Sequence, residues 1–173
     1  MFRPQKNQEE LLKILAKLPK NLDWECTFSG NGKTLSSCKQ LTEQLNLEDR
    51  VSFTWNQNPN ELYAQHNVAV LTSGKEGLPN SLIEAQISGL PVVTYLVGGV
   101  HECFEDNVSG FGVPFGNQAA FIDALALLGN DHERRNKMSS SAKDFGRTHF
   151  DFEKQSGMFF EAIKSFHKDN RLA

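Results

Sequence analysis

The chain is 173 residues long, is 39% apolar and 23% charged, and carries a formal net charge of −3. This length is enough for one domain with its own hydrophobic core. The slight negative charge argues against nucleic acid as a main partner, because phosphate backbones favour a basic protein face. No apolar run approaches the roughly 20 residues that cross a bilayer, so any membrane contact is expected to be peripheral.

The three cysteines, Cys26, Cys38 and Cys103, are scattered along the chain without the spacing of metal ligands. We interpret them as reduced thiols of a cytoplasmic protein. The sequence shows no cluster of metal ligands, and we expect neither a metal ion nor a cofactor.

Helical and strand-like patterns alternate along the chain, which predicts an α/β fold with a parallel sheet covered by helices on both faces. The first helix is expected to begin at Asn7, where Glu10 completes a capping-box pattern, and to end before Pro19. Strands are then expected at 23–29, 51–53, 68–72, 91–95 and 111–114. Helices are expected at 34–45, 59–65, 80–88, 118–128, 131–145 and 152–167.

The most informative segment is 73–85, which combines a glycine-containing loop after a buried strand with the start of a helix. The glycines would let the backbone approach a ligand. Asn80 is expected to cap the helix, whose first free N–H groups would come from Ser81 and Leu82. Such a helix start favours an anion, typically a phosphate. The loop also follows the carboxyl end of a strand, where open α/β sheets bind their ligands.

Two carboxylates belong to the same segment. Glu84 lies about one turn into the helix, and its side chain leans back toward the helix start. Glu76 lies in the loop and is expected to face the same ligand from the other side. Because carboxylates accept hydrogen bonds from sugar hydroxyls, a phosphate flanked by both side chains would fit a nucleotide sugar.

The spacing of Glu76 and Glu84, with Pro79 and Asn80 between them, resembles the signature of glycosyltransferase family 4, the large "glycosyl transferases group 1" family of GT-B fold. Further segments that are similar to the family are Arg3 with Lys6, 30–32, 47–51, 88–93, Gly98-Gly99 with Glu102, and 107–110. The resemblance covers nearly the whole chain. It implies a Rossmann-like domain that forms one half of a GT-B enzyme.

The resemblance implies a role for each matching residue. Arg3 and Lys6 would contact the donor diphosphate and stabilise negative charge on the leaving nucleotide. Glu76 would bind hydroxyls of the transferred sugar and support positive charge near its anomeric carbon, and Glu84 would bind the ribose. The other donor-binding residues are expected to be Gly77, Leu78, Pro79, Asn80, Ser81, Leu82, Gly98, Gly99 and Gly30.

The implied activity is the transfer of a hexose from a UDP-, GDP- or ADP-linked donor to an unidentified acceptor. Family members are typically retaining and need no metal. By analogy, the acceptor could belong to a cell-envelope polysaccharide, with the enzyme in the cytoplasm or peripheral to the inner face of the membrane. The sequence pattern alone leaves the roles of Gly30 and Glu102 open. Gly30 could border either a tight turn or a base pocket, Glu102 could contact the sugar or be solvated, and His101 is expected to be incidental.

The resemblance also implies that residues 1–173 form only the donor domain. This domain would lack the N-terminal acceptor-binding domain and most of its own first strand, of which Met1 and Phe2 could form the tail. The last helix, 152–167, would face the missing domain, which predicts an exposed apolar patch. Alone, the chain is expected to be inactive.

Three alternatives compete with a transferase. They are a nucleotide-sugar-binding module without transferase activity, a non-catalytic interaction domain with an occluded cleft, and a sugar-nucleotide epimerase of GT-B fold. The glutamate spacing, with Pro79-Asn80 inside it, favours the transferase over the epimerase.

Overall fold

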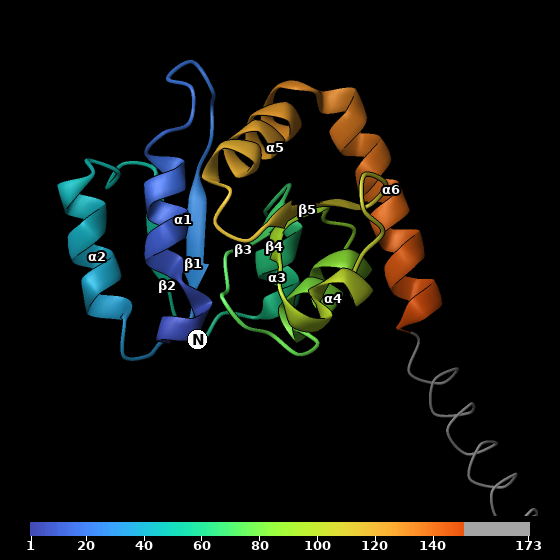
Figure 1. Cartoon of the computed structure of the whole chain (residues 1–173), viewed down its shortest axis with the longest axis horizontal. Coiled ribbons are helices and arrows are strands. Elements are labelled where there is room, and N and C mark those ends of the chain that lie inside the picture. Colours follow the sequence, from blue (N-terminus) through green and yellow to red (C-terminus); the bar gives the residue numbers. More distant parts are fainter. Residues whose placement is uncertain (151–173) are drawn as a thin grey trace, which may run out of the picture.

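The computed structural model describes residues 1–150, in which parallel strands form two separate sheets (Figure 1). The first sheet pairs β1 (Cys26–Ser29) with β2 (Val51–Thr54). In the second, β4 (Val92–Leu96) lies between β3 (Ala69–Leu71) and β5 (Gly110–Pro114). The helices are α1 (Gln8–Leu15), α2 (Leu35–Gln44), α3 (Pro59–Ala64), α4 (Asn80–Ile87), α5 (Gln118–Asn130) and α6 (His132–His149). Two short 3-10 helices, η1 (Pro4–Lys6) and η2 (Gly98–Glu102), complete the elements of residues 1–150.

Strand β4 divides the apolar interior into two clusters. Val93 and Tyr95 belong to the larger cluster, together with residues of α1 and α5. Val92 belongs to the smaller cluster, which includes Leu82 and Ala85 of α4. Because neighbouring side chains of a strand point to opposite faces, helices cover both faces of the second sheet. The predicted α/β fold with parallel strands flanked by helices is confirmed.

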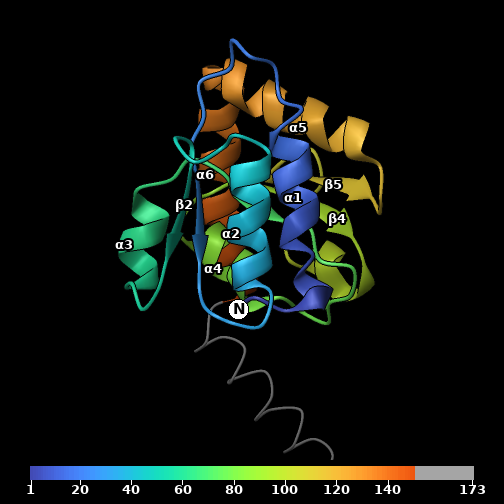
Figure 2. The ribbon, with the colours of Figure 1, turned by 90° about the vertical axis from the view of Figure 1, so that its left-hand side faces the viewer.

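The contacts between the helices agree with this division of the core. Helix α1 contacts both α2 and α5, and α4 contacts α6 on the other side of the second sheet. Figure 2 shows α1 and α2 side by side, in front of the first sheet. The amphipathic pattern of the first helix is confirmed, because its apolar side chains Leu11, Leu12, Ile14 and Leu15 are all buried. No helix within residues 1–150 is long and apolar enough to cross a membrane.

The capping predicted for the first helix is wrong in its mechanism. Asn7 does precede α1, but it has a left-handed conformation (φ 50°), and its side chain makes no capping hydrogen bond. Glu10 instead accepts hydrogen bonds from the Tyr95 hydroxyl and the Gln118 amide, both at 3.0 Å. The carboxylate that would close a capping box thus connects α1 to β4 and α5.

Phe2 lies beside the carboxyl end of β1. It forms an isolated parallel bridge with Gly32, and its backbone N–H donates to the carbonyl oxygen of Asn31 at 2.9 Å. Its ring is 1% exposed and contacts the rings of Phe28 and Phe53. Among the described residues, no strand joins β1 to β3, so the single sheet expected from the sequence is divided in two. The expected apolar patch on helix 152–167 lies outside the described residues.

Candidate functional site

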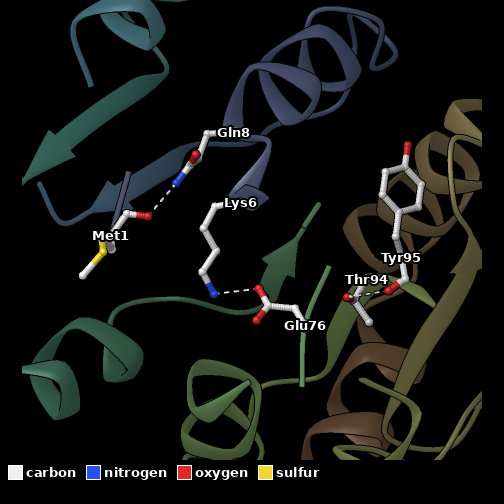
Figure 3. A network of polar contacts seen from close by, with 6 residues as sticks. All are labelled: Met1, Lys6, Gln8, Glu76, Thr94 and Tyr95. Atoms are coloured by element: carbon white, nitrogen blue, oxygen red, sulfur yellow. Dashed lines mark hydrogen bonds and ion pairs between the residues drawn. The ribbon is translucent and has the colours of Figure 1, made fainter. Parts of the chain in front are cut away.

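Lys6 and Glu76 form an ion pair at the centre of the site. The Lys6 ammonium donates to Oε1 of Glu76 at 2.6 Å, and the two side chains are 30% and 11% exposed (Figure 3). A backbone hydrogen bond joins the same two segments: the Gly74 N–H donates to the carbonyl oxygen of Gln5 at 2.8 Å. The loop that follows β3 is therefore held against the segment that ends in Lys6, and the pair can form across 70 residues.

The two glycines of η2 lie directly on this loop. Gly98 has φ +53°, and a Cβ at this position would overlap the carbonyl oxygen of Glu76. A Cβ on Gly99 would come within 2.5 Å of the carbonyl oxygen of Gly77. Only glycine permits this close approach. The structure thus brings Gly98 and Gly99 together with the Glu76 loop.

The start of α4 differs from the prediction in two details. Its N-cap is Pro79, without a side-chain capping bond, so Asn80 is the first helical residue and does not cap the helix. The Leu82 N–H donates to the carbonyl oxygen of Pro79 at 3.0 Å and is therefore not free for a ligand. The Leu82 side chain is buried in the core, whereas Leu78 is 48% exposed. The N–H groups that stay available for an anion are those of Asn80 and Ser81.

Glu84 lies on the exposed side of α4. Its Oε2 accepts a hydrogen bond at 3.0 Å from the hydroxyl of Tyr63, which lies on α3. The same hydroxyl is 3.2 Å from the carbonyl oxygen of Ser81. Burial raises the pKa of Tyr63, and the nearby charge of Glu84 raises it further. Sequence reasoning missed Tyr63, because nothing in the spacing of α3 and α4 indicates that they meet.

Arg3 is the N-cap residue of η1, the short helix that ends in Lys6. It lines a cavity of about 730 Å³ together with Asn31, Gly32 and Lys33, beside the bridge made by Phe2. Gly30 and Gly32 have φ values of +135° and +148°. A Cβ on Gly32 would overlap the carbonyl oxygen of Phe2. The glycine turn therefore gives the first residues of the chain room to approach β1, and two cations line the cavity next to it.

Two further residues near the site have structural contacts. The Nδ1 atom of His101 is 3.1 Å from the carbonyl oxygen of Gly98, and the ring is exposed. Cys103 lies beneath η2 and is fully buried. Burial raises its pKa to about 11, with smaller contributions from Glu102 and Glu76. The thiol is therefore protonated near neutral pH and is not a nucleophile there.

The family model for glycosyl transferases group 1 matches residues 1–145. The chain belongs to this family. Similar curated members are the N-acetyl-alpha-D-glucosaminyl L-malate synthase of Bacillus anthracis, 29% identical over 144 residues, and the lipopolysaccharide 1,6-galactosyltransferase of Escherichia coli K12, 30% identical over 152 residues. These alignments each cover 83% of the chain, but only 38% and 42% of the respective relative. The group 1 chain thus spans about two fifths of the length of these relatives.

Solved structures of glycosyltransferases share the fold. Anabaena HepE in complex with UDP aligns with a TM-score of 0.87 at 24% identity, over 94% of this chain and 46% of HepE. The C-terminal domain of a group 1 glycosyl transferase from Francisella tularensis aligns with a TM-score of 0.76 at 24% identity, over 87% of this chain and 83% of that domain. The α/β fold of the group 1 chain therefore matches that of GT-B glycosyltransferases.

Proposed function

We propose that the chain is the donor-binding half of a retaining, metal-independent glycosyltransferase of family 4. The observation that carries this proposal is the Lys6–Glu76 ion pair, at 2.6 Å, beside the start of α4 and the glycines of η2. A cation, free N–H groups and a carboxylate within one small region are complementary to the diphosphate and the sugar hydroxyls of a nucleotide sugar. HepE is named in complexes with UDP and with UDP-glucose, which supports this class of ligand.

In this proposal, Lys6 leaves Glu76 when the donor binds. Its ammonium, together with Arg3, neutralises the charge that develops on the leaving diphosphate. Glu76 then accepts hydrogen bonds from hydroxyls of the sugar and stabilises positive charge near the anomeric carbon. Glu84, which is exposed on α4, binds the ribose hydroxyls. The bond from the anomeric carbon to the diphosphate oxygen breaks, and a bond to an acceptor hydroxyl oxygen forms on the same face of the sugar. The proton of that hydroxyl passes to the leaving diphosphate oxygen.

The acceptor-binding domain and the first strand of the donor domain belong to the complete enzyme in this proposal. The share of the relatives that the chain spans, 38% and 42% for the two named above, supports a second domain. The named lipopolysaccharide galactosyltransferase and the Vi polysaccharide biosynthesis protein of Salmonella typhi, 32% identical over 140 residues, support a cell-envelope glycan as acceptor. Such an enzyme would work in the cytoplasm, at or near the inner face of the membrane.

The proposal is tested by titrating the chain with UDP-, GDP- and ADP-linked hexoses in a calorimeter. We expect donors of one nucleotide class to bind. Glu76→Ala should lower the affinity for the nucleotide sugar more than the affinity for the free nucleotide, because Glu76 would contact the sugar. Glu43→Ala, which removes an exposed carboxylate of α2, is the matched control. If no donor binds to the wild-type chain, the proposal is wrong.

The second candidate is a nucleotide-sugar-binding module without transferase activity. The partial coverage of the relatives favours it for the chain acting alone. Donor hydrolysis by the chain that is lost in Glu76→Ala would favour the enzyme. Binding without any turnover, in the chain and in a version joined to an acceptor domain, would favour the module.

A further inference from the structure

We propose that Tyr63 is a positioning residue that selects for an intact ribose by orienting the carboxylate of Glu84. This inference rests on the proposed function, in which Glu84 binds the ribose. The contact that carries it is the hydrogen bond from the Tyr63 hydroxyl to Oε2 of Glu84, at 3.0 Å between helices α3 and α4. Neither helix could supply this geometry by itself, because the two residues are 21 positions apart.

Glu84 needs an orienting partner because it is exposed. A free glutamate on a helix surface samples several rotamers and loses that freedom when it binds a ligand. Tyr63 is half-buried and packs against the smaller apolar cluster, so its ring is held by the core. Its hydroxyl contacts only one of the two carboxylate oxygens among the described residues. The second oxygen, Oε1, stays available to accept a hydrogen bond from a ribose hydroxyl.

Helix α3 also holds Tyr63 in a fixed position, because its start is capped. The Asn58 side chain caps this helix by accepting from the Asn60 N–H at 3.0 Å, and Pro59 starts it. The 3.2 Å contact of the Tyr63 hydroxyl with the Ser81 carbonyl oxygen lies in the first turn of α4. The same hydroxyl therefore contacts α4 at two points, the Glu84 carboxylate and a backbone carbonyl of the first turn. Burial and Glu84 both raise the pKa of Tyr63, so the phenol remains a donor at ordinary pH.

The test compares ribose with deoxyribose nucleotides. The full chain is titrated with UDP, GDP and ADP, and the nucleotide that binds is compared with its 2′-deoxy and 3′-deoxy forms. We expect wild type to prefer the ribose form and Tyr63→Phe to reduce this preference by about 3- to 10-fold, the effect of losing one orienting hydrogen bond. For the deoxy nucleotide that lacks the hydroxyl contacted by Glu84, Tyr63→Phe should change the affinity little. A merely structural role would instead weaken both nucleotides equally.

Glu84→Gln and a double variant show whether Tyr63 acts through the carboxylate. In the Glu84→Gln background, adding Tyr63→Phe should cause no further loss of preference. Tyr95→Phe is the matched control, since it removes another tyrosine hydroxyl, whose partner is Glu10 of α1 and not Glu84. We expect it to leave the ribose preference unchanged.

A second variant keeps the test independent of how well Tyr63→Phe folds. Replacing Tyr63 with 3,5-difluorotyrosine retains the hydroxyl, but this phenol ionises at a much lower pH than tyrosine. The ribose preference should then fall as pH rises through that ionisation, because a phenolate cannot donate. Wild type should show no such fall.

The outcomes separate the two proposals. If wild type binds no nucleotide, the proposed function fails and this inference fails with it. If wild type prefers ribose but Tyr63→Phe keeps the full preference, the role of Tyr63 is overturned while the proposed function stands. An equal loss of preference in the Glu84→Gln background would also overturn it, because Tyr63 would then act without Glu84.

Discussion

At the scale of single residues, the candidate site depends on contacts between side chains that are distant in the sequence. The Lys6–Glu76 ion pair joins a residue of η1 to the loop after β3. Sequence reasoning named both residues, but it assigned them to different parts of the donor. In the proposed function, donor binding exchanges this charge pairing for another.

Lys6→Met tests how much this ion pair contributes to stability and how much Lys6 contributes to donor affinity. We expect it to lower the free energy of unfolding by only about 1 kcal/mol, because the pair is partly solvated. Donor affinity should fall by about 10- to 100-fold, since a charged hydrogen bond to the diphosphate is lost. Urea titration and calorimetry measure the two effects. Lys13→Met, the same change at an exposed position of α1, is the control. An equal affinity for both variants would contradict a role for Lys6 in binding.

Gly99→Ala tests the close approach of η2 to the Glu76 loop. The new methyl group would come within 2.5 Å of the carbonyl oxygen of Gly77, so the loop or η2 must move. We expect a loss of about 1–3 kcal/mol in stability, measured by chemical denaturation, together with weaker donor binding. Gly74→Ala is the control, because its methyl group would meet only the Phe115 ring, at 3.6 Å. Stability unchanged by Gly99→Ala would show that the two segments separate easily.

At the scale of secondary-structure elements, most helices and strands lie where the sequence predicts them, within a few residues. Apolar periodicity is a local signal, as are the glycines and prolines that mark the ends of helices and strands, so both can be recognised without a structure. The left-handed φ of +81° at Gly89, directly after α4, agrees with the glycine expected there. The capping bonds at Asn7 and Asn80 were wrong, because they depend on the exact backbone angles of neighbouring turns. Tertiary contacts decide these angles.

Gly146→Ala tests how α6 packs on α4. Alanine normally stabilises a helix interior by about 1 kcal/mol relative to glycine. Here its methyl group would come within 2.5 Å of the backbone nitrogen of Ile87, so α6 would be pushed away from α4. We expect a net loss of about 1–3 kcal/mol in the free energy of unfolding, which thermal or urea denaturation measures.

The control for this change is Ser140→Ala, at an exposed position of α6, which should be neutral or slightly stabilising. If Gly146→Ala also stabilised the chain, the close crossing of α4 and α6 would be absent in solution.

At the scale of the whole molecule, the parallel strands form two sheets, and no strand joins them in the described part of the chain. The Cys26 and Gly30 N–H groups donate toward β2, to the carbonyl oxygens of Arg50 and Thr54. In a parallel strand, the intervening amides point to the opposite edge. These are the amides that a further strand between β1 and β3 would bond.

Hydrogen exchange tests the exposure of this edge. We expect the amides of Thr27 and Ser29 to exchange faster than that of Phe28, which lies on the β2 side of β1. Amides of β4, which is paired on both sides, should exchange slowest. Equal protection along β1 would mean that its open edge is covered in solution.

The buried thiols predict how global stability responds to alkaline pH. Burial raises the pKa of both Cys38 and Cys103 from 9.0 to about 11. Between these values the unfolded chain loses thiol protons that the folded chain keeps, so the free energy of unfolding should fall as pH rises from about 9 to about 11. Urea titration across this range measures the slope. Cys103→Ala should reduce it, and an unchanged slope would contradict the assignment.

The sequence by itself determined the order of the elements, the α/β class and the family signature around Glu76 and Glu84. These follow from residues close together in the chain, where hydrophobic period and backbone preference act directly. Only the tertiary structure decided that Lys6 pairs with Glu76, that the Tyr63 hydroxyl donates to Glu84, and that the sheet divides beside Phe2. These contacts join segments far apart in sequence, and their geometry comes from how the helices and strands pack against one another.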